Sequence, residues 1–241
     1  MVVADPAAEL LALVTGPGDP PPSEVGAAVR RRAELIRRRF GLALPPPFAE
    51  VPEGPAEHVP VRVAEPTDGA AIAAIKWRAF GANYRGGILD DAFLDGRDLV
   101  PPASFWVGRA MVPPSRRHHL LVWGRPGTVL AYLDAGPAHP DEGESGRIAD
   151  VGDLGEVYEL YVDPNVQGRG GGGRLLAEAE ARLGASGFEA AELSVLEGNV
   201  AAQRFYGAHG WAPTGRTVDV DLGIVAFREL RYGRRLPGAR P

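Results

Sequence analysis

Five glycines fall within residues 168–173, and this run constrains the fold more than any other feature of the chain. The preceding segment, 155–162, has few charges and predicts a buried strand, whereas the following segment predicts a helix. The apolar face of that helix would be formed by Leu175, Leu176, Ala179 and Leu183. A strand, a glycine loop and a helix start, in this order, present unpaired backbone N–H groups to an anion, which favours phosphate binding.

The glycine run literally matches G-x-G-x-x-G, the fingerprint of dinucleotide-binding Rossmann domains. That interpretation is disfavoured because residues 163–167 separate the strand from the first glycine, which in a Rossmann domain follows the strand directly. Only one further strand–helix unit follows, and Glu197 is a weak candidate for the acidic residue that should bind a ribose. A Walker-type phosphate loop is excluded, since the chain contains no Gly-Lys-Ser/Thr.

A second pattern, Q/R-x-x-G-x-G/A, uses more of these residues and fits Gln167–Gly172. In such a loop successive N–H groups converge on one concavity, and a Cβ would collide with a bound pyrophosphate or forbid the backbone angles. Arg169 and Arg174 would add cationic donors at the rim. The plain alternative is a glycine loop without function, which is disfavoured because ordering glycines between a strand and a helix is entropically unfavourable.

From residue 58 onward the pattern predicts one mixed α/β domain that ends near residue 236. Helices are expected from Thr67 or Asp68 to about Phe80, over 88–99, after the glycine run, and from the capping residue Asn199 to His209. Because a helix joins two of the buried strands, those strands should be parallel with a right-handed crossover. The expected strands are 58–65, 118–125, 128–136, 155–162, 190–196 and two within 211–232.

Residues 1–57 are expected to form a helical, proline-rich N-terminal extension, and residues 237–241 a short tail. The extension would hold two helices, at 5–15 and 23–40, each followed by a proline-rich stretch. Six arginines on the second helix suit either an acidic partner or a solvated helix face, and the solvated face is the favoured interpretation.

Composition excludes several classes of function. The chain has no cysteine, which rules out disulfides, thiolate catalysis and cysteine-based zinc sites. His118 and His119 lack a second group of ligands, so no metal site is expected. A net charge of −5 argues against nucleic-acid binding. No apolar run is long enough to span a bilayer and no signal peptide is evident, so a cytoplasmic location without membrane binding is expected.

Three segments resemble the motifs of the GCN5-related N-acetyltransferase (GNAT) family, in the family's order and spacing: GEVYELYVDP, QGRGGGGRLL and NVAAQRFYGAHGW. An earlier segment, WRAFGANYRGGILDD, resembles the first helices of bacterial members. The resemblance covers residues 58–236 and implies the GNAT fold, a largely antiparallel sheet with a splayed parallel strand pair, flanked by helices. The third segment fits N-x-x-A-x-x-x-Y-x-x-x-G-aromatic at Asn199, Ala202, Tyr206, Gly210 and Trp211.

The resemblance implies direct transfer of an acetyl group from acetyl-CoA to a primary amine of a small molecule or protein, within a ternary complex. Tyr206 is the candidate acid for the departing thiolate; the alternative is a tyrosine that packs in the core. A backbone N–H near Leu160 would stabilise the oxyanion. Family members often dimerise, so a homodimer is among the expected assemblies. The implied coenzyme-binding residues are Leu160, Tyr161, Val162, Gln167, Gly168, Arg169, Gly170, Gly171, Gly172, Gly173 and Asn199.

The base that deprotonates the amine is expected at Glu156, where several family members place it, with Glu159 as the second choice. Strand alternation puts Glu156 and Tyr158 on one face and Glu159 on the other, unless a bulge intervenes. Tyr158 would then line the acceptor site. Either glutamate could instead be an ordinary salt-bridged carboxylate, so the choice between them stays open.

Two other functions compete with acetyl transfer. One is a module that binds acyl-CoA without turnover and contacts a partner through its arginine-rich N-terminal helix. The other, less favoured, is an NAD(P)-binding oxidoreductase that uses the literal glycine motif. For a transferase, a cationic acceptor is favoured by acidic residues expected near the acceptor site, namely Asp90, Asp91 and Asp95.

Overall fold

The computed structural model describes residues 59–85, 88–89, 94, 100–139, 154–221 and 226–236. The expected N-terminal extension and tail lie outside these residues, as do Asp90, Asp91, Asp95 and most of the helix expected at 88–99. The described elements are β1 (Val61–Val63), the 3-10 turn η2 (Pro66–Asp68), α3 (Gly69–Tyr84), α5 (Ala103–Met111), β2 (His119–Arg125), β3 (Thr128–Pro137), β4 (Leu154–Val162), the 3-10 turn η5 (Pro164–Val166), α6 (Gly171–Ala185), β5 (Ala190–Leu196), α7 (Val200–Ala208), β6 (Ala212–Asp221) and β7 (Ala226–Arg235).

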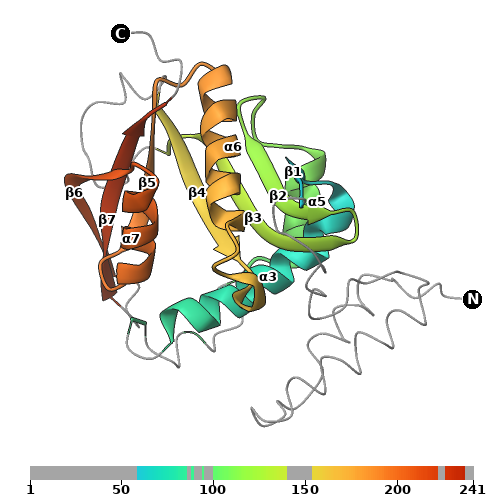
Figure 1. Cartoon of the computed structure of the whole chain (residues 1–241), viewed down its shortest axis with the longest axis horizontal. Helices are drawn as coiled ribbons and strands as arrows, with labels where there is room; N and C mark the ends of the chain where they lie inside the picture. Colours follow the sequence, from blue (N-terminus) through green and yellow to red (C-terminus); the bar gives the residue numbers. More distant parts are fainter. Residues whose placement is uncertain are drawn as a thin grey trace, which may run out of the picture. The chain divides into compact units, whose positions relative to one another are not determined.

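The described strands form one mixed sheet in the order β1-β2-β3-β4-β5-β7-β6 (Figure 1). All neighbours are antiparallel except β4 and β5, which are parallel as expected for strands joined by a helix. Their pairing is short, because only Leu154–Glu156 of β4 pairs with Ala190–Glu192 of β5. Beyond Glu156 the two strands part, which confirms the expected splayed pair and the mixed α/β fold class.

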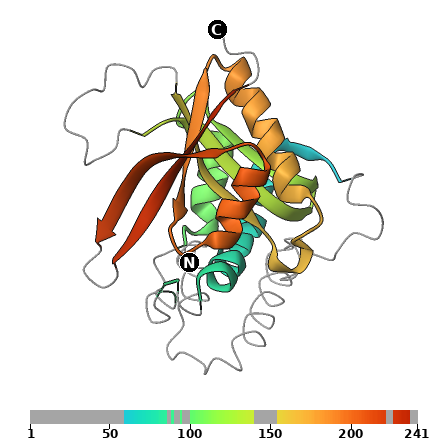
Figure 2. The same cartoon turned by 60° about the vertical axis from the view of Figure 1, so that its left-hand side comes forward.

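Helices cover both faces of the sheet (Figures 1 and 2). On one face α3 and α5 pack around the buried ring of Tyr132, together with Ile72, Ile75 and Trp106. On the other face lies α6, whose predicted apolar side is fully buried at Leu175, Leu176, Ala179 and Leu183. Among the described helices, none is long and apolar enough to cross a membrane.

Two helices differ from the sequence-based expectation. α3 continues past Phe80 to Tyr84, which brings its last turn to the cavity described below. The helix α5 was not predicted at all. It follows Pro102 at its N-cap and buries only Trp106, so it lacks the repeated apolar positions by which an amphipathic helix is recognised.

A β-bulge in β4 changes which side chains share a face. In the β3–β4 register Asp134 pairs with Glu159 and Ala135 pairs with Val157, so Tyr158 is the extra residue. The bulge shifts the alternation by one residue and puts Glu156 and Glu159 on the same face of the sheet. Simple alternation, which separates them, is therefore wrong for this strand. Gly155, adjacent to Glu156, faces α6, because a Cβ there would lie 3.2 Å from Leu183.

Candidate active site

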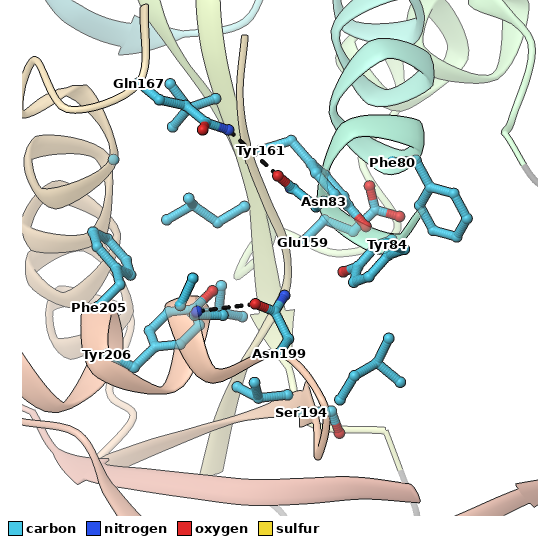
Figure 3. Close-up of a pocket in the computed structure, with 18 of the residues that line it drawn as sticks. Phe80, Asn83, Tyr84, Glu159, Tyr161, Gln167, Ser194, Asn199, Phe205 and Tyr206 are labelled. Carbon is cyan, nitrogen blue, oxygen red and sulfur yellow. Dashed lines mark hydrogen bonds between the residues drawn. The ribbon is translucent and has the colours of Figure 1, made fainter. Parts of the chain in front are cut away.

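The gap between β4 and β5 opens into a cavity of about 650 Å³. Its walls come from α3, β4, the glycine segment, β5, α7 and β7. In Figure 3 Phe80 and Tyr84 of α3 lie on one side of the cavity and Phe205 and Tyr206 of α7 on the other. Most residues predicted to act are brought together here: Tyr206, Leu160, Tyr161, Val162, Gln167, Gly168, Gly170, Gly171, Gly172, Gly173 and Asn199. Glu156 and Arg169 are not among the lining residues.

The splayed part of β4 leaves backbone amides free toward the cavity. The Asp163 amide donates to the Leu130 carbonyl of β3 at 2.9 Å, and alternate amides of an antiparallel strand point to the same neighbour. The amides of Leu160 and Val162 therefore face the β5 side, where β5 has already departed. Two consecutive donors on this side can pair with an extended ligand. The Tyr161 amide faces β3 instead, and the Tyr161 side chain is among those that line the cavity.

The glycines of the loop are required for different physical reasons. Gly168 and Gly170 have φ of 76° and 82°, in the left-handed region that favours glycine. Gly171 packs against Trp123, and a Cβ there would lie 2.3 Å from the indole ring. The first N–H groups of α6 have no acceptor within the helix, and the glycines that carry them line the cavity. The loop has the form predicted from the sequence, and Gly171, which also lines the cavity, is required in addition for packing on Trp123.

Side chains hold the loop against α3. The buried Asp163 carboxylate accepts from the Asn165 amide at 3.0 Å and pairs with Arg78 at 2.6 Å. At the next corner the Gln167 side chain donates to Asn83 at 3.4 Å. The loop therefore does not depend on the glycines alone for its position. Arg169 is exposed beside it.

Asn199 and Tyr206 approach the cavity from α7 and the turn before it. The Asn199 Oδ1 accepts from the Ala202 amide at 3.0 Å, which confirms the predicted cap. Its amide nitrogen provides further donor capacity at the cavity wall, beside the Tyr84 phenol. Tyr206 is buried, and burial raises the pKa of its phenol, with a smaller contribution from Tyr84. The phenol therefore carries its proton throughout the neutral pH range.

Glu156 is engaged away from the cavity. Its Oε1 lies 3.3 Å from Nη1 of Arg231, and its Oε2 accepts from the His139 backbone amide at 2.9 Å. The His139 ring lies 3.0 Å from the same Oε2. The structure thus does not bring Glu156 together with Tyr206 around one space.

Glu159, which lies on the same face of the sheet as Glu156, is among the residues that line the cavity. Its carboxylate is ion-paired with Lys76 of α3 and accepts from the Tyr132 hydroxyl at 2.6 Å. The side chain is 22% exposed, so it is sheltered but reachable. Glu159, the second choice in the sequence analysis, is therefore the glutamate of β4 that lines the same cavity as Tyr206.

Several cavity residues were missed by sequence reasoning. His209 lies one turn beyond Phe205 and donates through Nδ1 to the Phe205 carbonyl at 2.7 Å. Its Nε2 faces Gly173, where a Cβ would come within 2.5 Å of it. The i, i+4 spacing of an aromatic residue and a histidine in a helix that borders a phosphate loop was the available signal. No sequence pattern marks Ser194 or Glu229 as a site residue, because only the pairing of β5 with β7 brings them to the cavity.

The comparisons with known proteins agree with this geometry. The sequence model of the Acetyltransferase (GNAT) family matches residues 87–211, just over half of the chain. The chain belongs to this family. A mycothiol acetyltransferase of Brachybacterium faecium is 29% identical over 198 residues, which are 82% of this chain and 54% of the relative. The GNAT chain described here thus spans about half the length of that curated relative.

Solved structures support the same fold. The ribosomal-protein-alanine N-acetyltransferase from Brucella melitensis superposes with a TM-score of 0.55 at 21% identity, over 74% of this chain and 100% of that one. The PaiA N-acetyltransferase from Thermoplasma acidophilum, solved in complex with coenzyme A, gives 0.52 at 16% identity, over 73% and 98%. The expected family and fold class are confirmed.

Proposed function

We propose that this GNAT chain transfers the acetyl group of acetyl-CoA to a primary amine, with Glu159 receiving the amine proton and Tyr206 supplying a proton to the leaving sulfur. The observation that carries the proposal is the parting of β4 and β5 after Glu156. It opens one cavity that holds free strand amides, a helix N-terminus, a carboxylate and a protonated phenol.

The residues present fit coenzyme A. The amides of Leu160 and Val162 suit the pantetheine amides as a surrogate strand, and the first turn of α6 suits the pyrophosphate. Asn199 would donate to pantetheine, and the imidazole of His209 lies beside the phosphate region. When bound, acetyl-CoA supplies an activated thioester. Arg169 is proposed to act only at the solvent-exposed rim.

Glu159 is proposed as the base because it is the carboxylate of β4 that borders the cavity. Its two oxygens already accept from Lys76 and Tyr132, but each carboxylate oxygen retains a further lone pair. An amine, or a water between the amine and Glu159, can occupy it. Glu156 is then a structural carboxylate that holds Arg231 and His139.

Tyr206 is proposed as the acid. Its raised pKa keeps the phenol protonated at the pH where amines react. The buried position also keeps bulk water from that side of the cavity. The amide of Leu160 is the proposed donor to the developing oxyanion, because it faces the gap and has lost its strand partner.

The nature of the acceptor, a cytoplasmic location, a homodimer and the division into an extension, a domain and a tail remain predictions. The relative named mycothiol acetyltransferase makes its own substrate a reasonable member of an acceptor panel. That substrate is not assigned to this chain, because the chain spans only about half the length of that relative.

Calorimetric titration with acetyl-CoA, followed by thiol release in the presence of an amine panel, tests the proposal. Binding and amine-dependent release of coenzyme A are expected. Binding without release for any amine would favour the acyl-CoA-binding module instead. Binding of NAD(P), with none of acetyl-CoA, would overturn the proposal altogether.

A further inference from the structure

The cavity lining is acidic on the side away from the glycine loop. Two carboxylates, Glu159 and Glu229, line it, and no lysine or arginine is found among the described lining residues. Glu159 is already ion-paired with Lys76. Glu229 is half-buried and forms no ion pair or side-chain hydrogen bond with any residue that the structure describes. Among the described residues, Glu229 is therefore the carboxylate of the lining that no cation pairs with, since Arg231, two residues along on the same face of β7, is ion-paired with Glu156.

Strand pairing points Glu229 into the cavity. Glu229 of β7 is directly opposite Leu196 of β5, and residues opposite one another in an antiparallel pair share a face. Leu196 lines the cavity, as does Phe227, which is two residues before Glu229 on the same face of β7. The carboxylate thus belongs to the wall formed by β5 and β7, across from α3.

The facing wall carries aromatic rings, which favour a cation with an apolar body. Phe80, Tyr84 and Tyr161 line the cavity and contact one another, with centroids of Phe80 and Tyr84 4.8 Å apart. Aromatic faces attract ammonium groups. Burial is the largest cause that raises the pKa of Tyr84, and the charges of Glu159 and Glu229 both raise it further. Both carboxylates therefore act on the same phenol from two different strands.

In the wall that carries Glu229, one hydroxyl also lacks a hydrogen-bond partner among the described residues. The Ser194 Oγ is buried and makes no hydrogen bond with the described residues, and Ser194 lines the cavity from β5. Buried hydroxyls are nearly always hydrogen-bonded. An occupant that carries both a positive charge and a polar group would balance Glu229 and Ser194 together.

We propose that Glu229 binds a second cationic group of the acceptor, so that the preferred substrates are diamines or amino compounds with two positive charges. This inference rests on the proposed function. One amine loses its proton toward Glu159 and forms the new C–N bond, the C–S bond of acetyl-CoA breaks, and Tyr206 protonates the sulfur. The other ammonium stays against Glu229 and the ring of Tyr84 and is not acetylated.

The test compares 1,4-diaminobutane, and longer diamines, with amino alcohols of equal length, which lack the second charge. In the wild type, kcat/KM should favour the diamine by roughly tenfold or more, because a charge pair in a sheltered site is worth more than one in water. Glu229→Gln should reduce that preference to below about threefold, mainly through KM, with the Kd for acetyl-CoA unchanged. Glu229→Asp, which keeps the charge, should retain part of it.

Asp219→Asn is the matched control. Asp219 lies on the neighbouring strand β6, is exposed, and pairs with Arg228 outside the cavity. Its replacement removes the same charge from the same hairpin and should leave the preference for the diamine intact. An equal loss in both variants would mean that the overall charge of the hairpin, and not the position of Glu229, attracts the acceptor, and would overturn the inference.

Binding without turnover separates this inference from the proposed function. Diamine binding to the protein loaded with coenzyme A is measured by calorimetry for the wild type and Glu229→Gln. Binding that depends on Glu229 supports the inference even if no acetyl group is transferred. Binding of equal strength in both proteins, or no wild-type preference for the diamine, overturns it even if acetyl transfer is observed.

Discussion

The ammonium of Lys76 in α3 is ion-paired with the carboxylate of Glu159 in β4. Lys76 is the only lysine of the chain, and it is buried against the sheet face that carries Tyr132. The pair fixes the side chain that the bulge at Tyr158 turns toward α3. It therefore holds Glu159 at the cavity, whereas Glu156 is held elsewhere by Arg231 and His139.

Glu159→Gln should lower kcat/KM by roughly 10²-fold or more near neutral pH, because a general base contributes about that much. The loss should shrink at higher pH, where the amine acceptor is already deprotonated. Glu156→Gln should lower thermal stability, since glutamine has no charge and only one acceptor oxygen for the two partners Arg231 and His139, with a far smaller effect on turnover. Rate–pH profiles of both variants are the measurement, and the opposite ranking would restore Glu156 as the base.

Gly171→Ala should destabilise the fold by about 1–3 kcal/mol, because the new methyl group overlaps the buried Trp123 ring. It should also weaken acetyl-CoA binding, since relief of the overlap moves the first turn of α6. Gly207→Ala is the control, because a Cβ there meets no atom within 4 Å. That variant should be neutral or stabilised by up to about 1 kcal/mol, as alanine favours the helix. Denaturant unfolding would contradict this account if both variants behaved alike.

Gly170→Val should abolish or greatly weaken acetyl-CoA binding while the fold persists. The residue has φ of 82° and open space around its Cβ position, so valine brings backbone strain of about 1–3 kcal/mol and blocks the cavity. Gly187 has φ of 89° and the same open surroundings, but it follows α6 at its far end. Gly187→Val should therefore show a similar stability loss with unchanged affinity. Calorimetric Kd values for the pair separate strain from ligand contact.

Tyr206→Phe should reduce kcat by roughly 10²-fold and change the Kd for acetyl-CoA little, as expected for loss of an acid. Tyr232→Phe, at a buried tyrosine outside the cavity lining, is the matched control and should keep full activity. A reduction below about twofold for Tyr206→Phe would reassign this ring to packing. Single-turnover measurements distinguish the chemical step from product release.

The raised pKa of Tyr206 also predicts a pH profile. Its ordinary value is 10.0 and burial raises it, so the folded protein keeps the proton to higher pH than the unfolded chain does. The associated stability is present below pH 10 and is lost as the pH rises beyond it. Accordingly, kcat should show no alkaline limb from this group below pH 10. An alkaline limb at lower pH that disappears in Tyr206→Phe would contradict the assignment.

The local features of the site could be predicted from sequence, because they depend on residues close together in the chain. The glycine loop, the Asn199 cap and the start of α6 are of this kind. The bulge at Tyr158 could not, since it is set by pairing with β3. The same holds for the packing of Gly171 on Trp123 and for Glu229, which β7 delivers from far along the sequence. The helix α5 could not be predicted, because Trp106 is its single buried residue and one apolar position does not make a helical repeat.

Because β4 and β5 part, the cavity between them is lined by segments that lie far apart in the sequence. The strand amides, the glycine turn and α7 come from one continuous stretch, whereas α3 and β7, from before and after it, contribute two further walls that face each other. If the proposed roles hold, substitutions in β7 would change which amine is accepted while the affinity for acetyl-CoA stays the same.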